Sequence, residues 1–150
     1  MILHQNGKNQ TELKDWRSGQ SFKLKGYVIR SNSDYTRFLS HDSINDIIYV
    51  FDKKGKEYGV IKGYFKDTHS SEEIESVVKF FNKKKEVVAT YKGVIKDMSN
   101  DFTRFLIYYG KGTYGEGPYT EVRIDPKTPV YRLVNLEGKI IAAFDAFPKK

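Results

Sequence analysis

Two arginines recur in the same short sequence context, and they are the first residues whose type and setting suggest binding chemistry. Residues 34–39 read Asp-Tyr-Thr-Arg-Phe-Leu and residues 101–106 read Asp-Phe-Thr-Arg-Phe-Leu, so Arg104 lies 67 residues after Arg37. An arginine between aromatic side chains can stack on a nucleobase and hold a phosphate. It can equally pair with the aspartate that opens its own hexapeptide, and both interpretations stay open.

A glycine-rich segment at residues 110–118 is the second candidate. Clustered glycines let backbone N–H groups approach a phosphate closely. The dinucleotide-binding form of such a loop requires a helix after it, whereas residues 119–124 have the pattern of a strand. We therefore predict a two-stranded hairpin whose tip presents Lys111 and Tyr114 to a nucleic-acid strand or to a cleft in a partner protein.

Patterns typical of catalysis and metal binding are missing from the sequence. The three histidines, His4, His41 and His69, have no metal-ligand spacing, and the chain contains no cysteine. No G-x-S-x-G segment and no pair of carboxylates in a predicted cleft suggests a nucleophile or a general acid and base. The sequence therefore predicts a protein that is not an enzyme and that binds no cofactor or metal.

The charge balance favours an anionic partner. The chain of 150 residues has 26 Lys and Arg against 19 Asp and Glu, a net charge of +7, and its aromatic residues include 11 tyrosines and 10 phenylalanines. Excess positive charge raises the local concentration of nucleic acid and of acidic proteins. From these patterns we predict a binding surface made of Arg37, Arg104, Tyr35, Phe102, Lys23, Lys25, Lys92, Lys111 and Tyr114.

The elements that position these residues are predicted to be mostly antiparallel strands. Period-two alternation and runs of β-branched and aromatic residues are typical of strands. Such patterns occur at 22–30, 35–40, 47–51, 57–65, 87–96, 102–109, 119–124 and 130–134. Residues 139–147 fit either a helix or a strand, and the turn before them favours a strand.

One amphipathic helix is predicted at about residues 71–84. Ser70 and Glu73 have the spacing of a capping box at its start. An apolar stripe with helical spacing follows, formed by Ile74, Val77, Val78 and Phe81. This stripe must pack on a sheet. A shorter helix of one or two turns is predicted within residues 11–20.

The repeated hexapeptide predicts an internal duplication. The match at an offset of 67 residues extends upstream, and downstream it returns at an offset of 73, where Asp52 falls on Asp125. We therefore expect one domain over residues 1–150 that contains two four-strand units, at about 20–86 and 87–150.

Together these elements predict an α+β fold dominated by antiparallel sheet, with the helix packed on the sheet. Tandem units of four strands followed by a helix are similar in outline to the PUR-repeat and Whirly folds, which bind single-stranded nucleic acid. The similarity is one of topology and includes no motif residues of either family. The polar residues 1–10 are expected to form a flexible tail.

We therefore predict a small, basic module that binds nucleic acid and prefers single strands. The alternative is a protein-interaction or inhibitor module that docks through the glycine-rich hairpin tip, such as an accessory or host-targeting protein of a phage or mobile element. No apolar run approaches the roughly 18 residues that a membrane span needs. The absence of cysteine is compatible with the cytoplasmic location that we expect.

Overall fold

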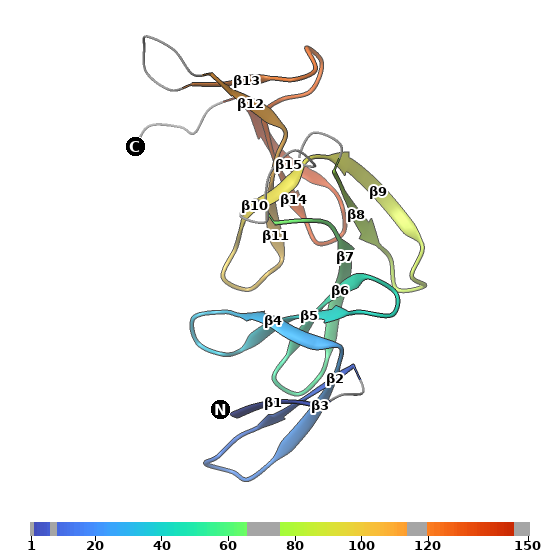
Figure 1. The fold of residues 1–150 in the computed structure, drawn as a ribbon, viewed down its shortest axis with the longest axis vertical. Coiled ribbons are helices and arrows are strands. Elements are labelled where there is room, and N and C mark those ends of the chain that lie inside the picture. The colour runs from blue at the N-terminus through green and yellow to red at the C-terminus, as the bar shows by residue number, and fades with distance from the viewer. Residues whose placement is uncertain (1, 7–8, 66–75, 114–119, 146–150) are drawn as a thin grey trace.

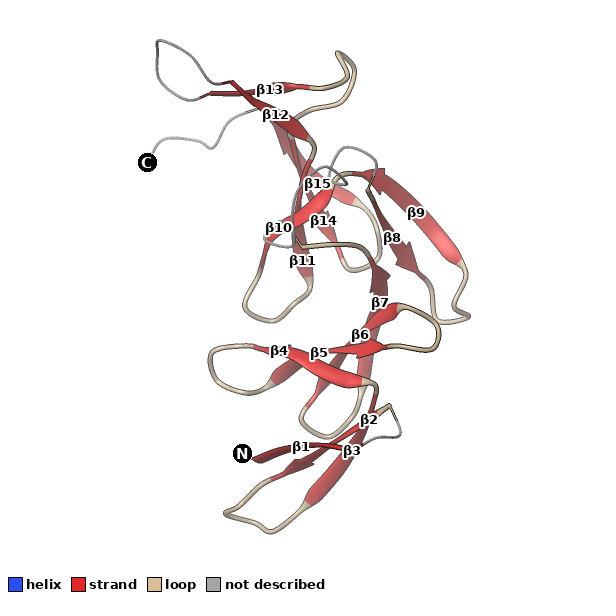
Figure 2. Cartoon of the chain, in the orientation of Figure 1, coloured by secondary structure: helices blue, strands red, loops and turns tan. Residues whose placement is uncertain are grey.

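The computed structural model consists of strands and turns in the residues that it describes, which are 2–6, 9–65, 76–113 and 120–145 (Figures 1 and 2). The predicted α+β class is therefore wrong, because this part of the chain is all-β. No helix in these ranges is long and apolar enough to cross a membrane. The outline shared with the PUR-repeat and Whirly folds does not apply, since it required a helix after each set of strands.

The strands form four antiparallel sheets. The first sheet contains β1 (Ile2–Asn6), β2 (Gln10–Lys14) and β3 (Ser21–Lys25). The largest has six strands, β4 (Tyr27–Ser31), β5 (Arg37–Asp42), β6 (Ile47–Asp52), β7 (Glu57–Lys62), β8 (Val77–Phe81) and β9 (Val87–Lys92). A four-stranded sheet contains β10 (Val94–Met98), β11 (Arg104–Tyr108), β14 (Tyr131–Asn135) and β15 (Ile140–Phe144). The remaining hairpin is β12 (Gly110–Thr113) with β13 (Thr120–Arg123).

These sheets follow one another along the long axis of the molecule, with β1–β3 at one end and β12–β13 at the other (Figure 1). The six-stranded sheet buries side chains on both faces. One face packs on the first sheet in a cluster of Leu13, Leu24, Phe38, Tyr49, Phe51 and Val60. The other face packs on the four-stranded sheet in a larger cluster that includes Leu39, Val50, Ile61, Phe80, Phe105 and Ile107. Because successive strand residues point to opposite faces, a continuous apolar run such as 47–51 supplies both clusters.

The repeated hexapeptide marks two equivalent hairpins. β4 pairs with β5 in the same register as β10 with β11, and the first strand of each pair has a bulge at the equivalent place. Tyr35 and Phe102, one in each turn, both have a φ of 57°. The offset of 67 residues therefore relates one hairpin of the six-stranded sheet to one hairpin of the four-stranded sheet.

Beyond these hairpins the predicted alignment is wrong. We placed Asp52 on Asp125, but Arg37 of β5 pairs with Asp52 of β6, and Arg104 of β11 pairs with Asn135 of β14. The structural counterpart of Asp52 is therefore Asn135. A four-strand unit is not the repeating element either, because the two sheets have six and four strands.

Glycine divides two segments that the alternation predicted to be single strands. Residues 22–30 split into β3 and β4 at Gly26, and residues 87–96 split into β9 and β10 at Gly93. Both glycines have a positive φ, 86° and 126°, and a Cβ at either position would collide with a backbone carbonyl group of the neighbouring strand. The chain passes from one sheet to the next at each glycine, in a conformation that a side chain would make costly.

The helix predicted at 71–84 is wrong where the structure describes the chain. Residues 66–75, with the capping box and Ile74, lie outside the described residues, and Val77–Phe81 form β8. Val78 and Phe80 are fully buried and alternate with half-buried neighbours, which is a period of two. Pairing with β7 on one side and β9 on the other suits these β-branched and aromatic residues. Tertiary pairing thus overrides the helical spacing.

The ends of the chain differ from expectation in two places and agree in one. Gln10–Lys14 form β2 and not a helical turn. Ile2–Asn6, expected to belong to a flexible tail, pair with β2 as strand β1. Ile140–Phe144 form β15, so the preference for a strand in this segment is confirmed.

Candidate nucleic-acid interface

Three hairpin turns share one local geometry, which fixes where their side chains point. Asp52, Asn82 and Asn135 open the turns after β6, β8 and β14. In each turn the N–H of this residue donates to the carbonyl oxygen four residues later, at 3.0, 2.9 and 2.9 Å. Its side-chain Oδ1 accepts bonds of 2.8 to 3.1 Å from two backbone N–H groups of the same turn. Because the Asp or Asn that opens each turn satisfies its backbone N–H groups, the side chains between are left for solvent or for a ligand.

The turns after β6 and β8 lie beside β3 and bring lysines together. A Cβ built on Gly55 would lie 3.4 Å from the side chain of Leu24 in β3. The Nζ atoms of Lys25 and Lys85 lie 5.7 and 5.0 Å from the ring centre of the same tyrosine, Tyr49. The two turns and β3 therefore form one surface. We define the lysine cluster as the exposed residues Lys23, Lys25, Lys53, Lys54, Lys56, Lys83, Lys84 and Lys85.

The carboxylates around the lysine cluster already have partners. Burial alone raises the pKa of Asp52, but bonds from the N–H groups of Lys56 and Lys54 outweigh it and lower that pKa. Glu57 pairs with Lys85 at 2.6 Å. Lysines outnumber these acids, so the surface keeps a positive charge that can attract a polyanion.

A hollow next to the lysine cluster contains two exposed aromatic rings. Its volume is about 340 Å³, and its walls are Asp15, Trp16, Arg17, Asp34, Tyr35, Thr36 and Lys53. Trp16 is 64% exposed and Tyr35 is 53% exposed. The guanidinium of Arg17 lies 5.3 Å from the centre of the indole ring. Lys53 belongs both to this aromatic hollow and to the lysine cluster, so the two surfaces are continuous.

Tyr35 and Phe102 occupy equivalent backbone positions in different surroundings. Phe102 is 3% exposed and belongs to the main core, whereas the ring of Tyr35 is open to solvent. A positive φ is unfavourable for an aromatic residue. Burial compensates for this cost at Phe102 but not at Tyr35, which leaves the Tyr35 ring available for stacking.

The two repeated arginines also differ. The Cζ of Arg37 lies 3.5 Å from the ring centre of Tyr58, and its Nη1 is buried without a hydrogen-bond partner. Arg104 is exposed, and its backbone N–H donates to the Ser99 hydroxyl at 3.0 Å. Arg37 is therefore packed against the sheet, whereas the side chain of Arg104 is open to solvent.

The structure brings together some of the predicted binding residues and separates others. Lys23, Lys25 and Tyr35 lie in the lysine cluster and the aromatic hollow. Lys92 and Lys111 are exposed on β9 and β12, toward the other end of the stack of sheets (Figure 1). Phe102 is in the core, and Tyr114 lies outside the described residues.

No protein-family model matches the chain, and neither a curated protein nor a solved structure matches it. Among the residues that the structure describes, no group of three or more His, Cys, Asp or Glu could hold a metal ion. The interface must therefore be judged on its own geometry and charge.

Sequence reasoning missed Trp16 and most of the lysine cluster. Lys83, Lys84 and Lys85 fall at the end of the helix predicted at about 71–84, where lysines suit the helix dipole. The signal that could have found them is the likeness of Asp52-Lys53-Lys54-Gly55 to Asn82-Lys83-Lys84-Lys85. Both are turns opened by Asp or Asn, and the last residue of each has a positive φ.

Proposed function

We propose that this protein binds single-stranded nucleic acid through the lysine cluster and the aromatic hollow. The observation that supports this proposal is the convergence of eight exposed lysines, from β3 and two hairpin turns, beside two exposed aromatic rings. Lysines neutralise backbone phosphates, and each base can stack on an aromatic ring whatever its sequence. A strand would place its phosphates along the turns after β6 and β8 and its bases in the hollow.

The carboxylates of the hollow favour a single strand over a duplex. A bond from the N–H of Arg17 lowers the pKa of Asp15, and a bond from the Thr36 hydroxyl lowers the pKa of Asp34. Both are therefore ionised at neutral pH and can accept hydrogen bonds from base amino groups. In a duplex one hydrogen of each amino group still faces a groove, but the base faces are stacked on one another, so only a single strand offers an amino group together with a free base face.

The test is fluorescence anisotropy with a labelled oligonucleotide, single-stranded or annealed to its complement. We expect the single strand to bind more tightly. Trp16→Ala and Tyr35→Ala should each weaken binding by about 1–3 kcal/mol per stacked base. Ile44→Ala removes an apolar side chain that is 80% exposed in the turn between β5 and β6 and serves as the control. Tighter binding of the duplex, or equal effects of all three variants, would contradict the proposal.

A second candidate function is protein interaction, and a separate surface supports it. β9 and β15 are edge strands, and they expose Val87, Val88, Ile140 and Ile141 by 48 to 51%. The turn before β15 contacts β9, because a Cβ on Gly138 would lie 2.9 Å from Ala89. Edge strands with exposed apolar side chains can pair with another chain. This surface, and not the glycine-rich hairpin tip, is the basis for the candidate, since the tip lies outside the described residues.

Self-association is the simplest form of such pairing to measure. Light scattering over a concentration series should show a mass above that of the monomer, and Val88→Lys with Ile141→Lys should restore the monomer. A mass that stays at the monomer value over the whole concentration series would contradict pairing between two copies.

A further inference from the structure

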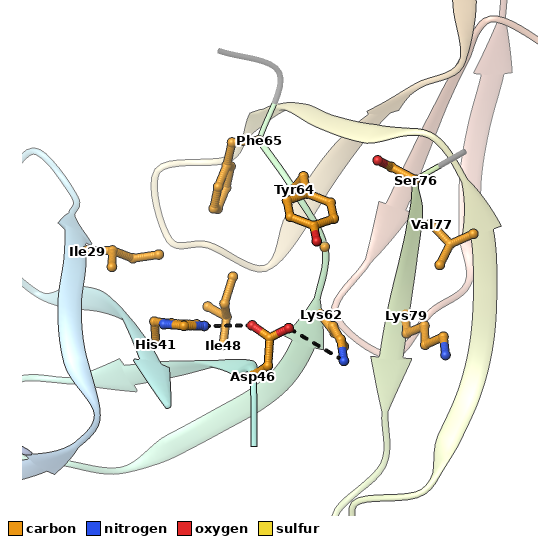
Figure 3. A pocket seen from close by; sticks show the side chains of 11 residues that line it. Ile29, His41, Asp46, Ile48, Lys62, Tyr64, Phe65, Ser76, Val77 and Lys79 are labelled. Carbon is orange, nitrogen blue, oxygen red and sulfur yellow. Dashed lines mark hydrogen bonds and ion pairs between the residues drawn. The ribbon is translucent and has the colours of Figure 1, made fainter. Parts of the chain in front are cut away.

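A larger pocket lies at the opposite end of the six-stranded sheet from the lysine cluster. Its volume is about 650 Å³, and β4, β5, β6, β7 and β8 contribute side chains to it (Figure 3). This volume falls within the roughly 300–1,000 Å³ of typical small-molecule sites. Its walls differ in character, polar on one side and apolar on the other.

Three side chains on the polar side are linked to one another. The Nε2 of His41 lies 2.9 Å from Oδ1 of Asp46, and the Nζ of Lys62 lies 3.7 Å from Oδ2 of the same carboxylate (Figure 3). The bond with His41 is the main cause that lowers the pKa of Asp46, so this carboxylate is ionised at neutral pH. Asp46 thus positions both His41 and Lys62 at the pocket wall.

Lys79 adds a second ammonium group next to Lys62. The two lysines are direct cross-strand partners on β7 and β8, and both line the pocket. Like charges directly opposite each other in a sheet are destabilising. Among the described residues that line the pocket, the one carboxylate, Asp46, stands against two lysines, so these residues together carry a net positive charge. An anion between Lys62 and Lys79 would relieve their repulsion.

The side of the pocket opposite these groups has two rings, Tyr64 and Phe65, with Ile29 (Figure 3). Ile48 lies next to His41, its cross-strand partner, and Val77 lies next to Lys79 on β8. Tyr64 is 55% exposed, whereas Phe65 is half-buried, and the guanidinium of Arg30 lies 5.1 Å from the centre of its ring. The two aromatic rings, with aliphatic side chains across the pocket from them, suit a flat, apolar group.

We propose that this pocket binds a nucleoside phosphate, with the phosphate between Lys62 and Lys79 and the base against Phe65 and Ile48. The ligand must therefore combine one compact anion with one flat ring system. The distance between these two parts must match the distance between the polar and apolar walls. This inference does not depend on the lysine cluster, which lies at the other end of the sheet. The occupant is either a free mononucleotide or the phosphorylated end of a strand.

Calorimetric titration with AMP, adenosine and inorganic phosphate tests the proposal. We expect AMP to bind more tightly than either of its parts, because only AMP reaches both walls. Lys79→Gln should weaken AMP binding by about tenfold or more, as expected for a lost charged hydrogen bond. Lys84→Gln removes the same charge from the lysine cluster and should leave AMP binding unchanged.

Thermal unfolding without ligand controls for damage to the fold. Lys79→Gln should not lower the unfolding temperature, because it removes one member of a like-charge pair. The proposal is overturned if AMP binds no more tightly than phosphate, or if Lys79→Gln and Lys84→Gln weaken AMP equally.

Competition with a 5′-phosphorylated oligonucleotide separates the two sources of the ligand. Displacement of AMP by this oligonucleotide, but not by its unphosphorylated form, identifies a strand end as an occupant. AMP binding that neither oligonucleotide affects identifies a free nucleotide. In both cases a triple variant, in which Lys23, Lys54 and Lys84 are each replaced by Gln, should still bind AMP. A failure of the proposed strand binding can therefore be told apart from a failure at this pocket.

Discussion

Asp42 shows how a single buried carboxylate can connect the first two sheets. It is fully buried, and it accepts hydrogen bonds of 2.9 Å from the side chains of Asn9 and Asn45 and from the N–H of Ile44. Burial alone raises the pKa of Asp42, but the bonds from Asn45 and Asn9 outweigh it and bring that pKa to about 2. The segment between β1 and β2 is thereby bound to the turn after β5.

Asp42→Asn should destabilise the protein in a pH-dependent way. The pKa in the folded protein lies below the value of about 3.9 expected for the unfolded chain. The carboxylate therefore stabilises the fold fully above pH 4 or so, and its contribution is lost as the pH falls toward about 2. Urea unfolding at neutral pH should show a loss of about 1–3 kcal/mol. The difference from the unchanged protein should shrink on acidification, and a difference that is constant with pH would contradict this assignment.

Tyr35 and Phe102 allow a matched test of stacking against packing. Phe102→Ala empties a core position and should cost about 3–5 kcal/mol of unfolding free energy. Tyr35→Ala removes an exposed ring and should leave stability nearly unchanged while it weakens nucleic-acid binding. Denaturant titration and anisotropy of both variants separate the two roles. A large stability loss for Tyr35→Ala would mean that its ring supports the turn and is not a binding platform.

At the scale of elements, local patterns predicted strands well but did not predict how strands join. The runs at 35–40, 47–51 and 57–65 correspond to β5, β6 and β7. The alternation could not reveal the breaks at Gly26 and Gly93, because a glycine that fits a strand and a glycine at positive φ look alike in sequence. The segment around β8 has apolar residues that satisfy both a helical and a strand period, so only its neighbours in the sheet decide between them.

The strand assignment of β8 predicts which of two adjacent phenylalanines is in the core. Phe80 is fully buried and Phe81 is half-buried. Phe80→Ala should therefore cost about 3–5 kcal/mol, and Phe81→Ala clearly less. Thermal or urea unfolding of the two variants measures this difference. In the predicted helix Phe81 belonged to the apolar stripe and Phe80 only widened it, so a larger loss at Phe81 would favour that interpretation.

The glycines that join the sheets should be sensitive to a single methyl group. Gly26→Ala and Gly93→Ala combine an unfavourable φ with a collision against the next strand. Gly19 also has a positive φ, of 74°, but its Cβ position is open, so Gly19→Ala reports the cost of φ alone. We expect Gly19→Ala to lower the free energy of unfolding by about 1–2 kcal/mol. Gly26→Ala and Gly93→Ala should lower it by at least about 1–3 kcal/mol more. Equal losses of unfolding free energy in the three variants would show that the neighbouring strand shifts to make room for the added methyl group.

At the scale of the whole molecule, the stack of sheets separates two surfaces of different chemistry. The turns after β6 and β8 place the lysine cluster at one end of the six-stranded sheet, and the pocket with Lys62 and Lys79 lies at the other end. The net charge of +7 predicted an anionic partner but not where its cations gather. Lys53 and Lys84 are far apart in sequence, and it is the pairing of β7 with β8 that brings their turns side by side. The repeated arginines were conspicuous in sequence, yet Arg37 is packed against Tyr58.

The salt dependence of oligonucleotide binding tests the central claim most directly. For a single strand, log affinity falls with log salt by about 0.7 per phosphate contact. Replacing Lys23, Lys54 and Lys84 by Gln should reduce that slope by about 2. Replacing Lys92, Lys111 and Lys127 by Gln changes the net charge equally and should leave the slope unchanged. If the two triple variants change the slope equally, or if the unchanged protein binds more weakly than millimolar at low salt, the lysine cluster is not a nucleic-acid interface.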